Sequence, residues 1–363
     1  MDFDVKNHTI FLTLTGSRVY GTADESSDYD YRGVLIPPKR YFLGCNSRFE
    51  QHESSIPNDT TIFGINKFLK LAADNNPNVV ELLYIKPDHW LKSEPEWFII
   101  HDARNLFLSK KCFHTFRGYA HAQLKRVKGH RAWLLQGEIP EPKREDFSLD
   151  PMKPLPQEIV GAADSLISLW LQQNDIEEDL AEIARHDKSL ATAFRQRLWE
   201  FLELHLGIAR TEIEGLVWGG AAKQLGYQDS VLDVLQREKR YRQAKRHHES
   251  WLHWKAERNA KRKEVETKCG FDGKHLSHCL RLMAMCKEIL TEGTVRVERY
   301  DASFLRAIRD GQYSFEELEQ RYQDLDKQLE DLYQKSTLQH QPKRTEIEAL
   351  GIEVVERFLR RVA

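Results

Sequence analysis

Two aspartates separated by one residue, Asp28 and Asp30, are the first side chains in this sequence that could do chemistry together. They precede the apolar segment Gly33–Ile36, which predicts a strand. Alternate residues of a strand point the same way, with Cα atoms roughly 7 Å apart. Two carboxylates held that close repel by up to ~4 kcal/mol at an effective dielectric of 20. A divalent cation such as Mg2+ or Mn2+ would remove this repulsion, so the pair predicts a metal site.

A glycine–serine turn, Gly16-Ser17, comes shortly before the aspartates and ends the apolar run Ile10–Leu14, a predicted buried strand. Glycine lets the backbone turn sharply and expose consecutive N–H groups, which form a nest for phosphate. A phosphate nest followed by an acidic pair is what metal-assisted nucleotidyl transfer requires. The alternative interpretation is a glycine turn followed by an exposed acidic hairpin.

The motifs GSRVYGT and SDYDYRGV resemble the DNA polymerase beta nucleotidyltransferase superfamily, and more narrowly its RlaP-like branch of RNA-ligase-associated nucleotidyltransferases. The resemblance is strong over residues 10–85 and 270–340 and weak between them. It implies transfer of a nucleoside monophosphate from a nucleoside triphosphate, such as ATP, to a hydroxyl, with release of pyrophosphate. It also implies a role in RNA repair or modification, with an RNA end, a protein hydroxyl or a small molecule as acceptor.

The same resemblance implies further site residues. Superfamily members usually take a third carboxylate from a strand after the acidic pair, and Asp59 is the candidate, as metal ligand or general base. Glu53 competes with it, and Asp59 could also be a plain turn residue. Similar sequences carry an Asn-Pro-x-x-x-Glu-Leu segment near the nucleotide, here Asn76 and Glu81; the alternative is a helix cap with a solvated glutamate.

A second landmark, GFDGKHLSHCLRLMAMCKEILTEG, resembles the Asp-x-Lys-His-x-x-His-x-x-Arg-Leu helix of the RlaP-type branch. Its cations would offset the charge of the nucleotide, although the histidines could equally be structural. Of the arginines near the first motif, Arg32 could neutralise phosphate or clamp the aspartates. The predicted nucleotide-binding residues are Gly16, Ser17, Arg18, Tyr20, Arg32, Asn76, Glu81, Lys274, His278 and Arg281.

Short strands and helices must position these residues, and they predict an α+β fold. Residues 1–108 are expected to form a nucleotidyltransferase domain with a mixed sheet, and residues 109–363 a helical domain with a proline-rich loop at 138–156. Further helices are predicted between 162 and 245. The predicted N-terminal elements are strands at Phe49–Glu53 and Asp59–Phe63, a helix at Ile65–Ala73, a surface connection at Lys39–Gly44 and a short helix at Val79–Tyr84 capped by Asn78.

Two segments are locally basic although the whole chain of 363 residues has a net charge of only -2. Arg117–Arg131 contains five lysines or arginines and no acid, and Arg237–Lys268 contains twelve against five glutamates. The second segment also contains Trp251 and Trp254, and basic residues interleaved with aromatics are typical of RNA-binding surfaces. Alternatively, the tryptophans face a core and the lysines form its solvated side.

The remaining composition predicts a cytoplasmic protein. The sequence has no apolar run long enough to span a bilayer and no basic signal-peptide start. Five scattered cysteines fit reduced thiols. The alternative function is a catalytically silent nucleic-acid-binding or regulatory protein on the same fold. Asp28 and Asp30 argue against this alternative, because in a site that no longer catalyses a reaction their mutual repulsion would bring no benefit.

Overall fold

The computed structural model describes residues 3–25, 27–45, 48–54, 59–153, 222–257 and 260–362, and the single positions 155, 161, 165, 166 and 219. The chain forms two compact units, one of residues 1–135 with 259–363 and one of residues 136–258. Apart from positions 165 and 166, the helices predicted between 162 and 218 lie outside the described residues. Within the described ranges, no helix is both long enough and apolar enough to cross a membrane.

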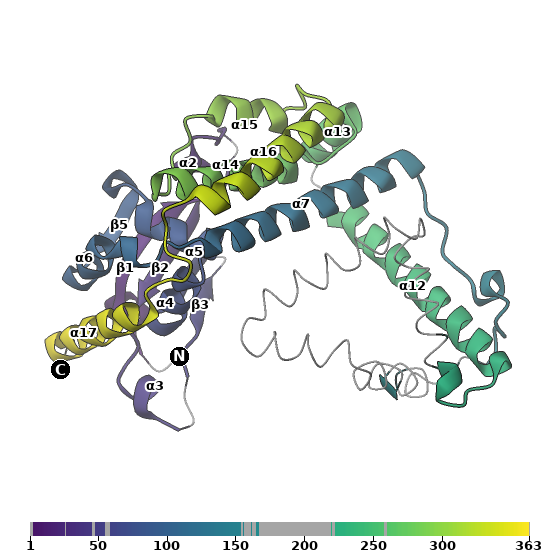
Figure 1. The fold of residues 1–363 in the computed structure, drawn as a ribbon, viewed down its shortest axis with the longest axis horizontal. Coiled ribbons are helices and arrows are strands. Elements are labelled where there is room, and N and C mark those ends of the chain that lie inside the picture. Colours follow the sequence, from purple (N-terminus) through teal and green to yellow (C-terminus); the bar gives the residue numbers. More distant parts are fainter. Residues whose placement is uncertain are drawn as a thin grey trace. The chain divides into compact units, whose positions relative to one another are not determined.

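The first unit contains a five-stranded sheet in the order β3-β4-β2-β1-β5 (Figure 1). β2 and β4 run parallel, and the other neighbouring strands are antiparallel. The mixed sheet predicted for an α+β fold is therefore confirmed. The strands are β1 (Thr9–Thr15), β2 (Asp30–Leu35), β3 (Gln51–Ser54), β4 (Thr60–Gly64) and β5 (Trp90–Ser93).

Helices make up most of the rest of the chain. In the first unit they are α1 (Val5–His8), α2 (Ser17–Tyr20), α3 (Arg40–Leu43), α4 (Ile65–Ala73), α5 (Pro77–Val80), α6 (Pro95–Asp102), α7 (Lys111–Gln136), α13 (Ala260–Cys269), α14 (Gly273–Glu292), α15 (Ala302–Arg309), α16 (Phe315–Lys335) and α17 (Arg344–Val362), with 3-10 turns η1 (Glu81–Tyr84), η2 (Pro87–His89) and η3 (Arg104–Leu106). The described part of the second unit contains η4 (Arg144–Phe147) and α12 (Asp229–Glu257).

Two local predictions require correction. The connection at Lys39–Gly44 contains the short helix α3. The helix after Pro77 is capped by Asn76 rather than Asn78, because the Asn76 side chain accepts a hydrogen bond from the Asn78 amide and Pro77 occupies the first helical position. The predicted helix at Ile65–Ala73 is confirmed by α4.

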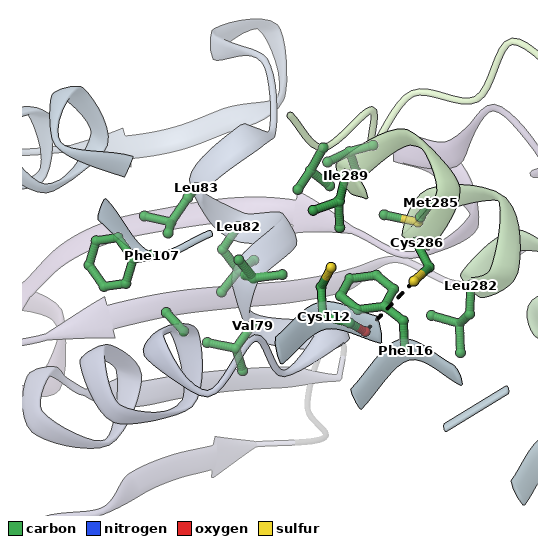
Figure 2. Close-up of a cluster of buried hydrophobic side chains, with 14 of the residues drawn as sticks. Val79, Leu82, Leu83, Phe107, Cys112, Phe116, Leu282, Met285, Cys286 and Ile289 are labelled. Carbon is green, nitrogen blue, oxygen red and sulfur yellow. Dashed lines mark hydrogen bonds between the residues drawn. The ribbon is translucent and has the colours of Figure 1, made fainter. Parts of the chain in front are cut away.

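The sheet and the C-terminal helices share one hydrophobic core. Figure 2 shows side chains from η1, α7 and α14 meeting in this core, with the Cys286 thiol donating to the Cys112 carbonyl at 3.8 Å. The compact units therefore differ from the predicted boundary at residue 108, because helices on both sides of the second unit bury their apolar faces with the sheet.

The strand register gathers the predicted site residues at one end of the sheet. Thr15, the last residue of β1, pairs with Asp30, the first residue of β2. Tyr31 pairs with Thr60 on the parallel strand β4, and the Tyr31 amide donates to the Asp59 carbonyl at 2.8 Å. Gly16, Asp30 and Asp59 therefore lie at neighbouring strand ends.

The packing of Phe11 supports β1 and gives a first prediction. Its ring stacks on the Trp97 ring of α6 with centroids 3.6 Å apart, and both side chains are fully buried. Phe11→Ala should lower the free energy of unfolding by about 3–5 kcal/mol, because it removes buried area and leaves a cavity. Chemical denaturation of both proteins would measure this, and a loss below about 1 kcal/mol would contradict the packing described.

Candidate active site

A cavity of about 340 Å3 lies beside the ends of β1 and β2. One wall comes from the N-terminal segment, residues 16–30, and the other from α13, α14 and α15. The structure thus brings together residues that are at least 235 positions apart in the chain. The predicted residues that line the cavity are Gly16, Ser17, Tyr20, Asp28, Asp30, Lys274, His278 and Arg281.

Gly16 connects β1 to α2 and lies against Asp30. Its φ is +73°, a conformation that side-chain-bearing residues rarely adopt, and a Cβ at this position would collide with Asp30 Oδ2. Thr15 also donates from Oγ1 to the Asp30 carbonyl at 3.1 Å. The Asp30 carboxylate therefore packs directly against the backbone of the turn, and only glycine at position 16 permits this contact.

Asp28 lies in the connection that precedes β2, so the prediction that both aspartates belong to one strand was wrong. Arg18 explains the difference: it donates to the Ser27 carbonyl at 2.6 Å and the Asp28 carbonyl at 3.4 Å, and stacks on the Tyr29 ring at 3.7 Å. These two carbonyls accept hydrogen bonds from a side chain instead of from a neighbouring strand. Arg18 holds this segment and does not line the cavity, whereas Asp28 does.

The charges around Asp30 perturb its ionisation. Burial raises the pKa of the Asp30 carboxyl, and the Asp59 and Asp28 carboxylates raise it further, while Arg32 and Lys274 oppose the shift. Asp59 is exposed and does not line the cavity, but its position next to β2 lets it act on Asp30. Glu53, on β3, pairs with Thr61 of β4 and does not line the cavity either.

The carboxylates fit a divalent cation only in part. Among the described residues, no three His, Cys, Asp or Glu side chains are arranged to hold a metal ion together. Mg2+, however, is usually held by one or two carboxylates, with substrate phosphates and water completing its octahedron. Asp28 and Asp30 both line the cavity, and burial raises the pKa of Asp30 because its charged form loses solvent there, which a bound cation would offset.

Glu81 lies outside the cavity and joins two of the residues that line it. Its carboxylate is 1% exposed, accepts from the Tyr20 hydroxyl at 2.7 Å, and lies 3.3 Å from Arg281 Nη1. The Arg281 guanidinium also stacks over the Tyr20 ring at 3.8 Å. Arg32 Nη1 approaches the same carboxylate at 3.9 Å and donates to the Asn78 carbonyl at 2.7 Å. The buried glutamate therefore connects α2, β2 and α14.

His278 is neutral at physiological pH. Burial lowers the pKa of His278 to about 3, and Arg281, His275, Arg32 and Lys274 add to the effect. Arg281 Nη2 lies 3.1 Å from His278 Nδ1. Because a guanidinium can only donate, Nδ1 must accept, and the proton of the neutral ring lies on Nε2.

The remaining predicted residue, Asn76, caps α5 and donates to the Tyr119 hydroxyl at 3.0 Å without lining the cavity. Sequence reasoning missed Thr22, Asp24, Arg309 and Asp310, all of which line the cavity. Arg309 donates from Nη1 to the Thr22 carbonyl at 2.8 Å. No local motif marks it, because only the packing of α15 brings it to the cavity.

Some basic residues in each of the two basic segments form ion pairs with acids of the described residues. On α7, Arg117 forms a two-point contact with Asp326 at 2.5 and 2.7 Å, and Lys128 and Arg131 pair with Glu319 and Glu316. These acids belong to α16 and offset three of the five basic residues, whereas Lys125 and Arg126 are exposed, so the predicted RNA contact on α7 stays a prediction.

In the second unit, Arg242 pairs with the buried Glu238 at 2.9 Å, and Lys255 pairs with Glu138 at 2.9 Å. Trp251 is only 6% exposed, which supports the core interpretation for this tryptophan. A stacking platform for bases would need its ring in solvent.

Comparisons with known proteins agree with the N-terminal motifs. Residues 3–144 match the model of the family described as RlaP, the RNA repair pathway DNA polymerase beta family. The match confirms the resemblance to polymerase beta-like nucleotidyltransferases in that part of the chain. It ends before the C-terminal helices, so the predicted resemblance of residues 270–340 stays a prediction.

One relative is described as an uncharacterized 38.9 kDa protein in the nrdC-mobD intergenic region of Enterobacteria phage T4. It is 30% identical over an alignment of 154 residues, and the match covers 37% of this chain and 45% of the relative. This chain thus spans less than half the length of that protein. No solved structure matches the chain.

The buried Glu81–Arg281 pair gives a stability prediction. Glu81→Gln should lower the free energy of unfolding by about 3 kcal/mol, because it leaves the buried Arg281 guanidinium without its counter-charge. The double variant Glu81→Gln with Arg281→Met should recover much of that loss. Glu53→Gln, an exposed glutamate on β3, is the matched control, and equal losses in the single and double variants would disprove the pairing.

The lowered pKa of His278 gives a pH prediction. The pKa of His278 is about 3 in the folded protein and ~6.5 in the unfolded chain. Between these two values the unfolded chain binds a proton that the folded protein does not, so protonation favours unfolding. Over this range His278 should reduce the free energy of unfolding by up to ~1.4 kcal/mol per pH unit as pH falls. Denaturation of wild type and His278→Gln at pH 4–7 would test this; parallel pH profiles would contradict it.

Proposed function

We propose that this protein is a nucleotidyltransferase that uses Mg2+ or Mn2+ to move a nucleoside monophosphate from a nucleoside triphosphate to a hydroxyl acceptor. The observation that carries this proposal is one cavity lined by the Gly16-Ser17 turn, the Asp28 and Asp30 carboxylates and cationic residues of α14. The family match over residues 3–144 supports the same reaction class.

The phosphates of the substrate would lie along the Gly16-Ser17 turn, where backbone N–H groups bind anions. Asp28 and Asp30 would hold the divalent cation, which when bound supplies charge neutralisation and polarises the α-phosphate. Lys274, whose charge already acts on Asp30, would balance the charge of the phosphates from the opposite wall.

In the transfer step, the acceptor oxygen forms a bond to the α-phosphorus while the bond from that phosphorus to the bridging oxygen breaks. The leaving group is pyrophosphate, and the acceptor proton passes to a base. Asp59 is our candidate for that base, or for a third metal ligand, because it lies at the strand end next to Asp30. The neutral His278 could donate from Nε2 to a phosphate or to the acceptor without adding charge.

We propose an RNA hydroxyl as the acceptor, because the matching family is described by an RNA repair pathway. Ion pairs offset the charge of Arg117, Lys128 and Arg131 on α7. We therefore assign the RNA contact to the basic segment Arg237–Lys268. We also propose a cytoplasmic location, because the five cysteines of the protein are free thiols and thiols stay reduced in the cytosol.

The proposal predicts that transfer depends on the aspartates. Wild type, Asp28→Asn and Asp30→Asn are incubated with each labelled nucleoside triphosphate, Mg2+ or Mn2+, and total RNA. Each variant should lose more activity than the ~10–100-fold typical of losing an outer-shell partner of a metal. Asp88→Asn, an exposed aspartate of η2, is the matched control and should keep full activity.

Thermal unfolding supplies a second readout. Because the raised pKa means that the ionised Asp30 is disfavoured in the folded protein, Asp30→Asn should raise the melting temperature without metal. Added nucleotide with Mg2+ should stabilise wild type and Asp88→Asn but not Asp30→Asn. Label transfer that survives both active-site substitutions would refute the proposed function.

A further inference from the structure

The positive side chains of the cavity are not equivalent. Among the described residues that line it, Lys274, Arg281 and Arg309 carry positive charge at neutral pH. The Arg281 charge is offset internally, because Glu81 faces it at 3.3 Å and is itself buried. A bound anion would therefore gain less from Arg281 than its position on the cavity wall suggests.

Arg309 has a different environment. It is half-buried at the end of α15, and its one hydrogen bond among the described residues goes to a neutral group, the Thr22 carbonyl at 2.8 Å. No carboxylate of the described residues lies within 4.0 Å of its guanidinium, although Asp310 lines the same cavity. By contrast, Arg299 in the preceding loop is bound by both Glu288 and Asp301.

A close contact between two helices places Arg309 beside Lys274. A Cβ at Gly273 would lie 2.6 Å from the Ile308 carbonyl oxygen and 3.1 Å from Arg309 Cα. Glycine at this position therefore lets the start of α14 lie directly against the end of α15. Lys274 follows Gly273 in the chain, so the same contact brings two positive side chains to one wall of the cavity.

We propose that Arg309 binds the β- and γ-phosphates of the nucleoside triphosphate, and that Arg281 acts as a positioning residue for Tyr20. This inference rests on the proposed function, which places the α-phosphate beside the cation held by Asp28 and Asp30. The two outer phosphates carry most of the remaining negative charge of the substrate. A guanidinium matches phosphate oxygens with two parallel N–H donors, which an ammonium group cannot do.

The test compares Arg309→Gln with Arg306→Gln, an exposed arginine one turn earlier on α15. Calorimetry with Mg2+ measures the binding of ATP, AMP and inorganic tripolyphosphate to each purified full-length protein. Arg309→Gln should weaken the binding of ATP and tripolyphosphate by about tenfold or more, the effect of a lost charge-assisted hydrogen bond. AMP, which has no β- or γ-phosphate, should bind all three proteins alike, and Arg306→Gln should match wild type throughout.

Arg309→Lys keeps the charge without the paired donors and separates ligand binding from folding. Its affinity for ATP should lie between those of wild type and Arg309→Gln, at an unchanged melting temperature. Equal weakening of ATP and AMP in Arg309→Gln would assign the side chain to support of the Thr22 loop and overturn the inference. Tripolyphosphate binding that Arg309→Gln leaves intact would overturn it as well.

The same measurements separate this inference from the proposed function. If wild type binds ATP and tripolyphosphate through Arg309 but transfers no nucleotide to RNA, the phosphate site stands and the proposed transferase activity fails. If transfer occurs and Arg309→Gln supports it with an unchanged KM for the nucleotide, the activity stands and the role of Arg309 fails.

Discussion

The candidate site depends on a buried carboxylate that holds two distant parts of the chain together. Glu81 accepts from Tyr20 and faces Arg281, residues that are 61 and 200 positions away. Burying a glutamate and an arginine is costly unless each neutralises the other and their remaining donors find partners. Tyr20, His278 and Met285 supply those partners for Arg281. The cavity wall of α14 is thereby fixed relative to the turn that follows β1.

A second constraint acts at the other wall. The Asp30 carboxylate packs against Gly16, and burial together with Asp59 and Asp28 raises its pKa. The folded protein thus carries an electrostatic cost at this point, and Arg32 and Lys274 relieve it only in part. Such a cost is typical of functional sites, where residues are arranged for a ligand rather than for the stability of the free protein.

Local sequence patterns predicted much of the N-terminal region. Apolar runs and turn residues placed β1, β2, β4 and α4, and the glycine and aspartate motifs identified one wall of the cavity. The roles of Arg18, Glu81 and Arg309 could not be derived in this way, because each depends on a partner brought near by tertiary packing. The acids that offset three basic residues of α7 could not be predicted for the same reason, because they lie on α16, 185 to 209 residues further along.

The central claim is that this cavity holds a triphosphate between a metal-binding carboxylate pair and a cationic wall. A crystal structure of the protein with a non-hydrolysable nucleoside triphosphate and Mg2+ tests it most directly. Our account predicts one bound ion contacted by Asp28 and Asp30, with the α-phosphate beside it and the outer phosphates near Lys274 and Arg309. Nucleotide bound elsewhere, with the two aspartates separated and solvated, would contradict it.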